Sequence, residues 1–184
     1  MSRQFWSETV AWATAPGTAV ANTATETIVF PNTTLPGNFL QDGRAIRLRI
    51  QGQYSTTATP TLIFTLRFGG VAGTVLCKTA AVTLPTIVAG VFDLDIMVQT
   101  RSNGATGTVM AIGTANIHAG VAPTVASAVG NAATTPMTAG GVLAPAVATV
   151  DLTADTALSI TATWSAASAS NTLTGLNYTI EAMN

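Results

Sequence analysis

The chain has 184 residues, of which 48% are hydrophobic and only 8% are charged, and its formal net charge is −1. This length fits one domain with a real core, and the apolar fraction excludes a chain that is disordered by composition. An ordinary soluble domain carries about 25% charged residues. A surface this poor in charge favours burial in an assembly, with a threonine-rich monomer surface as the alternative.

The charge pattern and the cysteine content exclude several classes of protein. The single Cys77 excludes an internal disulfide and is compatible with synthesis in a cytoplasm. Residues 1–8 lack the apolar segment of a signal peptide, and Gly, Pro and Thr interrupt the uncharged stretch 102–150, so we expect no membrane helix. A nucleic-acid partner needs a clustered cationic stripe. Four of the seven basic residues lie instead on, or directly before, the two clearly alternating strands at 45–54 and 61–68: Arg44, Arg47, Arg49 and Arg67.

The N-terminal residues 1–23 show neither a helical nor a strand period, and we interpret them as an extended arm preceding a single domain of residues 24–184. This arm holds Phe5, Trp6 and Trp12. Large rings in a terminal arm are suited to dock on a neighbouring protein. They could equally pack on the chain's own domain.

Strict alternation of apolar and polar residues predicts strands that are buried on one face. Ile46, Leu48, Ile50 and Tyr54 share one face of the first long strand. Such a face is most simply covered by a second sheet. We therefore expect an all-β protein, an antiparallel β-sandwich that is jelly-roll-like, although a barrel has the same pattern. Eight or nine strands are predicted, at residues 25–30, 45–54, 61–68, 75–82, 91–100, 108–117, 147–152, 158–165 and 173–183.

Three of these strands give more specific predictions. Residues 91–100 and 108–117 form a hairpin around Asn103 and Gly104, since Asn-Gly tolerates the positive φ of a tight turn. In the last strand, four residues at alternate positions are expected on one face: Leu176, Tyr178, Ile180 and Ala182.

Asp93 and Asp95 lie on one face of their strand, about 7 Å apart. A calcium site could use this pair with loop oxygens. Cross-strand ion pairs with Arg47, Arg49 and Arg67 are the better interpretation, so we expect no metal.

Residues 118–145 contain no recognisable element and are expected to form a long apolar loop. Loops of this length are uncommon in compact domains unless they are functional. An apolar loop is not a free solvated linker, so we interpret it as a contact loop at a subunit interface. Its candidate interface residues are His118, Val121, Val125, Val129, Met137, Val142 and Leu143.

Catalytic and cofactor motifs are absent from the sequence. The only histidine, His118, has no nucleophile or acid in a recognisable pattern, and there is no G-x-S-x-G, no P-loop and no Cys/His cluster. Spacing alone does not exclude a Ser-His-Asp arrangement, because triads are spatial. We expect no enzyme activity and no cofactor.

Residues 103–116 and 149–181 resemble small β-sandwich proteins encoded among the structural genes of tailed bacteriophages. The segments Trp164–Thr172 and Tyr178–Met183 carry most of this likeness. The resemblance implies a virion protein made in the bacterial cytoplasm: a capsid decoration (cement) protein on the capsid surface, acting as a homotrimer with the major capsid protein as its partner. The alternative is a receptor- or glycan-binding module of a phage tail or head fibre. No functional residue is carried over by motif.

Overall fold

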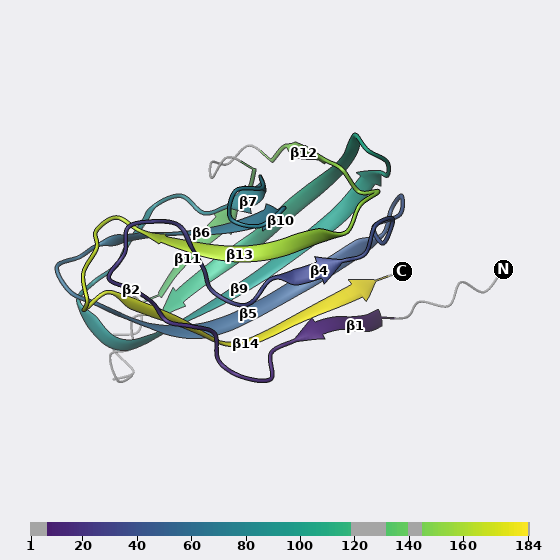
Figure 1. The fold of residues 1–184 in the computed structure, drawn as a ribbon. Coiled ribbons are helices and arrows are strands. Elements are labelled where there is room, and N and C mark those ends of the chain that lie inside the picture. The colour runs from purple at the N-terminus through teal and green to yellow at the C-terminus, as the bar shows by residue number, and fades with distance from the viewer. Residues whose placement is uncertain (1–6, 119–131, 140–144, 184) are drawn as a thin grey trace.

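The computed structural model describes residues 7–118, 132–139 and 145–183, which form two antiparallel β-sheets and no helix (Figure 1). No helix in this described part has the length and hydropathy needed to span a membrane. The larger sheet runs in the order β1 (Ser7–Trp12), β14 (Thr172–Met183), β5 (Ala45–Thr56), β9 (Ile87–Ser102), β10 (Gly107–His118) and β11 (Ala132–Met137), with β2 (Val20–Ala21) beside β14 and β12 (Val147–Val150) beside β10. The smaller sheet runs β3 (Thr27–Ile28), β13 (Thr156–Trp164), β6 (Thr61–Phe68) and β7 (Thr74–Lys78), with β4 (Thr33–Leu35) beside β13 and β8 (Val82–Thr83) beside β6.

The core lies between the two sheets, where the alternating apolar residues of each strand meet. Ile46, Leu48 and Ile50 of β5 are buried, as their period of two predicts. The rings of Phe64 on β6 and Phe92 on β9 pack across the core, with centroids 4.9 Å apart. The predicted antiparallel β-sandwich and the hairpin of β9 and β10 are confirmed.

The chain forms more strands than the eight or nine expected, because several are short edge strands. The arm contributes β1 and β2, which both pair with β14, so its described part extends the larger sheet. The segment 118–145, expected to lack any element, contains β11, which pairs with β10. Seven candidate interface residues lie outside the described residues: Phe5, Trp6, Val121, Val125, Val129, Val142 and Leu143.

Met137, predicted at a subunit interface, is instead fully buried in the core. It ends β11, and the next residue, Thr138, exchanges two main-chain hydrogen bonds with Lys78 of the smaller sheet. These main-chain hydrogen bonds join the two sheets along one edge of the sandwich, which we call a seam. Met137 is buried on the inner side of this seam.

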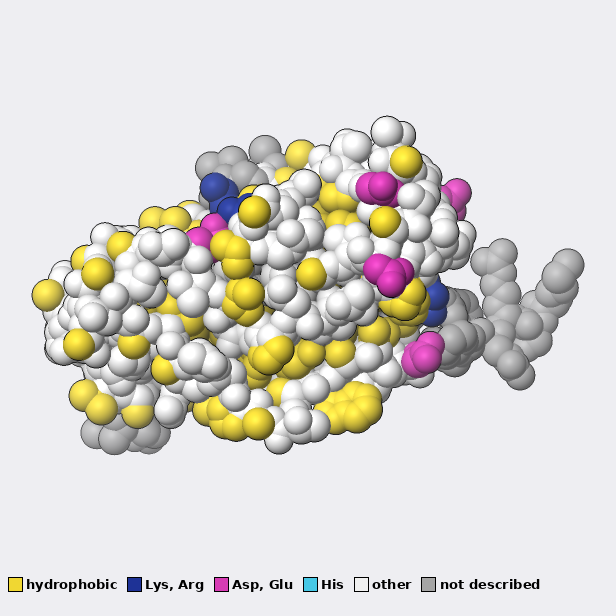
Figure 2. All heavy atoms as spheres, in the orientation of Figure 1, with side chains coloured by type: hydrophobic (Ala, Val, Ile, Leu, Met, Phe, Trp, Pro, Cys, Tyr) yellow, Lys and Arg dark blue, Asp and Glu magenta, His cyan; other side chains and the backbone are white. Residues whose placement is uncertain are grey.

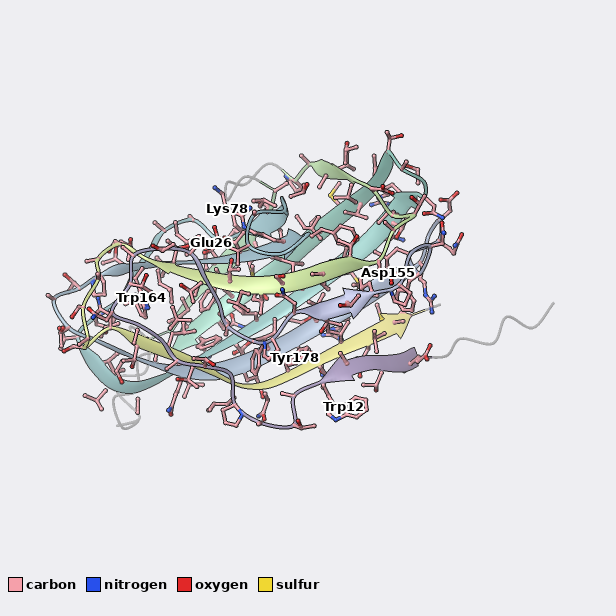
Figure 3. The ribbon with its side chains drawn as sticks, in the orientation of Figure 1. Trp12, Glu26, Lys78, Asp155, Trp164 and Tyr178 are labelled. Atoms are coloured by element: carbon pink, nitrogen blue, oxygen red, sulfur yellow. The ribbon has the colours of Figure 1, made fainter. Side chains whose placement is uncertain are left out.

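The opposite seam of the sandwich is joined by side chains. Tyr178 on β14 shares a hydrogen bond of 2.8 Å with the hydroxyl of Thr33 on β4. Its ring also packs against Phe30, with centroids 4.9 Å apart. Tyr178 thus contacts the smaller sheet from the larger one, near the edge that β1 extends (Figure 3).

Arg67 does not face the acidic residues of β9, because β6 belongs to the other sheet. Its guanidinium donates to both carboxylate oxygens of Glu26, at 2.6 and 2.7 Å, and to the carbonyl of Gly73. The hydroxyl of Thr161 on β13 also donates to Glu26. The hydrogen bond from Arg67 lowers the pKa of Glu26 more than burial raises it.

The hydroxyl of Tyr54 supports a prediction on stability. It is buried beside Gly90 and has no hydrogen-bond partner among the described residues. Tyr54→Phe removes an unsatisfied polar group, so we expect the free energy of unfolding to stay the same or rise by up to about 1 kcal/mol. The matched variant Tyr178→Phe loses a made hydrogen bond and should cost about 1 kcal/mol. Urea unfolding measures both, and a clear loss in Tyr54→Phe would contradict the assignment.

Glu26 supports a prediction on pH dependence. The pKa of Glu26 is lower in the folded chain than in the unfolded chain. The stability that its ionised carboxylate contributes is therefore present at neutral pH and is lost as the pH falls through the folded pKa. Glu26→Gln should cost about 1 kcal/mol at neutral pH, since the pair is partly exposed to solvent. The difference between wild type and variant should shrink in acid. A difference that stays constant with pH would show that the charge of Glu26 contributes nothing.

Candidate functional site

The outer face of the larger sheet carries polar side chains that are aligned across four strands. Directly paired residues share a face of a sheet. One such row contains Asn177, Gln51, Asp93 and Asn116, from β14, β5, β9 and β10. The pairing therefore brings together residues that are far apart in the sequence.

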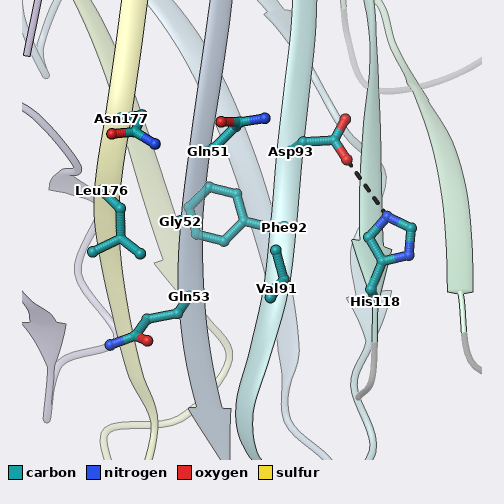
Figure 4. A pocket seen from close by; sticks show the side chains of 9 residues that line it. All are labelled: Gln51, Gly52, Gln53, Val91, Phe92, Asp93, His118, Leu176 and Asn177. Carbon is teal, nitrogen blue, oxygen red and sulfur yellow. Dashed lines mark ion pairs between the residues drawn. The ribbon is translucent and has the colours of Figure 1, made fainter. Parts of the chain in front are cut away.

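A hollow of about 380 Å³ lies on this face, beside the first half of β9 and the end of β10 (Figure 4). Amide and carboxylate groups surround it together with exposed apolar side chains, since Val91 is 51% and Leu176 is 37% exposed. Its lining residues are Gln51, Gly52, Gln53, Val91, Phe92, Asp93, His118, Leu176 and Asn177.

A β-bulge in β14 shapes one side of the hollow. Gly175 pairs with Gly52 and Asn177 pairs with Gln51, which leaves Leu176 as an extra residue. Because a bulge redirects side chains, both Leu176 and Asn177 are exposed. The prediction that Leu176 shares the inner face of Tyr178, Ile180 and Ala182 is therefore wrong.

The hollow is supported from below by the ring of Phe92. An added Cβ at Gly52 would lie 2.5 Å from this ring and 2.3 Å from the carbonyl oxygen of Thr174. Only glycine lets the buried ring lie directly against β5 at this point. The close approach fixes the spacing of the strands that carry Gln51 and Asp93.

Asp93 is held in place by two neighbours on β10. The Nδ2 of Asn116 donates to its Oδ2 at 2.8 Å, and the Nε2 of His118 lies 3.5 Å from its Oδ1. His118 was predicted at an interface, and the structure places it, exposed, at the rim of the hollow. This pair orients the Asp93 carboxylate on the outer face.

Asp95 lies in the next row and forms the predicted ion pair with Arg47. The Nε of Arg47 donates to its Oδ1 at 2.8 Å, and a second guanidinium nitrogen donates to its Oδ2. Hydrogen bonding from Arg47 lowers the pKa of the Asp95 carboxyl, so it stays ionised at neutral pH. The Nε of Arg49 lies 3.9 Å from the same carboxylate.

The lining residues of the hollow define the chemistry it can perform. They include a histidine and a carboxylate but no Ser, Thr, Cys or Lys that could act as a nucleophile beside His118. Within the described residues, no group of three or more His, Cys, Asp or Glu is placed to hold a metal ion. The arrangement is suited to hydrogen bonding with a ligand that is rich in donors and acceptors.

Sequence reasoning identified His118 and Asp93 as candidates but missed the glutamines and Asn177. The alternation in β5 placed Gln51 and Gln53 on the polar face, which was the available signal. The bulge at Leu176 has no mark in the sequence, so the position of Asn177 beside them could not be inferred.

A scan against protein-family models found no match, and a search of curated proteins found none either. Among solved structures, the chain is similar to the CBM2 module of the evolved Dit of Lactobacillus casei BL23 phage J-1, at 10% sequence identity and a TM-score of 0.37. The match covers 99% of this chain and 98% of that one. At this level of similarity, no property of that module is transferred to this chain.

Proposed function

We propose that the chain is a non-catalytic binding module of a tailed-phage virion and that the hollow on the outer face of the larger sheet binds a glycan. The observation that carries the glycan proposal is the row of amide and carboxylate side chains beside exposed apolar ones. The resemblance of residues 103–116 and 149–181 to phage structural proteins supports the virion part.

A sugar needs hydrogen-bonding partners that both donate and accept. The amides of Gln51, Gln53 and Asn177 do both, and the carboxylate of Asp93 accepts. Asp93 is oriented by Asn116 and His118, so this acceptor is positioned before a ligand arrives. Preorganised polar groups lose less entropy on binding than mobile ones.

A sugar ring also has apolar C–H surfaces, which need apolar contacts. Val91 and Leu176 are both exposed at the hollow, where they offer such surface between the polar groups. A few placed polar groups around apolar surface are the usual composition of a small-ligand site.

We predict that Gln51→Ala and Asn177→Ala each weaken glycan binding about tenfold, because each removes a hydrogen bond worth about 1.4 kcal/mol. A glycan array with the wild-type protein selects the oligosaccharide, and isothermal titration calorimetry measures the affinities. Both side chains are exposed, so stability should be unchanged.

Gln99→Ala is the matched control, since Gln99 lies on the same face about 20 Å along β9 from Asp93. It should bind as the wild type does. The glycan proposal fails if the wild type binds no glycan on the array, or if the Gln51 and Asn177 variants bind as tightly as the Gln99 variant.

A second candidate function is capsid decoration by a homotrimer that binds the major capsid protein, and a separate surface favours it. Ile112 pairs with Met97, and Met110 pairs with Val147, at the other end of the outer face. These four residues form an apolar patch, in which Met97, Ile112 and Val147 are exposed. Figure 2 views the molecule from the side of the smaller sheet, and that side also shows few charged side chains, which fits a protein that is covered in an assembly.

For this second function we predict a native mass of three times the chain mass by light scattering on a sizing column. Ile112→Glu should reduce the native mass to that of one chain, because the substitution would bury a charge in the subunit interface. Thr114→Glu, at an exposed position on the same strand, should remain trimeric. A monomeric wild type that does not bind assembled capsids would exclude this function.

A further inference from the structure

The exposed Trp12 lies on the same face of the larger sheet as the hollow. It ends β1 and pairs with Thr179, whose partner on β5 is Arg49. Ala11 before it is turned inward and packs against the core, so alternation directs Trp12 outward. Figure 3 shows its side chain standing away from β1 at the edge of the sheet.

The exposure of Trp12 is unusual for so large a side chain. It is 60% exposed, whereas Trp164 is buried in the core with its Nε1 donating to the carbonyl of Val20. Leaving an indole in water forgoes the burial energy that a tryptophan normally contributes. A rigid, flat and exposed ring is an effective contact surface for a ligand, since only two side-chain torsions are ordered on binding.

The path from Trp12 to the hollow is short and continuous. β1 and β14 are neighbours about 5 Å apart, and the row of Asn177 is two residues, about 7 Å, from the row of Thr179. Thr179 and Asn177 therefore lie between the indole and Gln51. A ligand that reaches from the hollow to Trp12 must be longer than one sugar ring.

Both β9 carboxylates beside this path are already engaged with neighbouring side chains. Asp95 is bound by Arg47 and approached by Arg49, and Asp93 lies against His118. The surface between Trp12 and the hollow thus offers a hydroxyl, an amide and an aromatic face. These groups match an uncharged sugar, whose C–H face is attracted to the negative face of the indole ring.

We infer that the outer face is an extended site for an uncharged oligosaccharide, in which the hollow holds one sugar and Trp12 stacks on another. This inference rests on the proposed glycan function and adds a second subsite to it. Trp12 then contributes to binding only when the ligand is long enough to span both subsites.

The test compares short and long ligands. The probes are glucose and N-acetylglucosamine, each as the free sugar and as a linear trisaccharide, together with the oligosaccharide selected on the array and its component sugar. Trp12→Ala should weaken oligosaccharide binding about tenfold and leave single-sugar binding unchanged, whereas Trp12→Phe should retain most of the affinity. Tryptophan emission should change with the oligosaccharide in the wild type and not in Trp12→Phe.

The outcomes separate this inference from the function on which it rests. Oligosaccharide binding that is lost in Gln51→Ala but intact in Trp12→Ala overturns the second subsite and leaves the glycan function standing. Equal losses for single sugars and oligosaccharides in Trp12→Ala also overturn it. A wild type that binds none of these sugars overturns both, and a loss of capsid binding in Trp12→Ala would make Trp12 a protein contact instead.

Discussion

Packing between the inner faces of two sheets is the constraint on which the structure depends. Phe64 and Phe92 meet across the core, and Phe92 reaches β5 only because Gly52 has no side chain. The same contact fixes the strands that carry Gln51 and Asp93 on the outer face. The core and the candidate site thus lie on opposite faces of the same two strands, because successive residues of β5 and β9 point alternately to the inner and the outer face. Packing defects under the site would therefore disturb its geometry as well as the stability.

The long strands could be predicted from the sequence because their burial is one-sided. Ile46, Leu48 and Ile50 show that pattern without interruption, and all are buried. β11 could not be predicted, because its small Ala and Thr residues carry little periodic signal. The sheet to which each strand belongs was also hidden. Arg67 was therefore expected beside the carboxylates of β9, whereas it forms its ion pair with Glu26.

The candidate site was less accessible to sequence reasoning than the fold. A row such as Asn177, Gln51 and Asp93 is created by the register between strands, which no local spacing encodes. The bulge at Leu176 shifts that register by one residue and exposes an apolar side chain expected in the core. The outward alternation of β5 did indicate that Gln51 faces solvent. What could not be inferred was its neighbours, because they depend on tertiary pairing.

The two seams of the sandwich differ in how they resist opening. Main-chain hydrogen bonds between Lys78 and Thr138 join one seam, whereas the side chain of Tyr178 links the other to Thr33. Local opening favours regions held by few and exposed contacts. Amide protons of β1 would therefore exchange with solvent earlier than those near Thr138. The edge that presents Trp12 would then yield to a bound ligand more readily than the opposite seam, where main-chain hydrogen bonds join the two sheets.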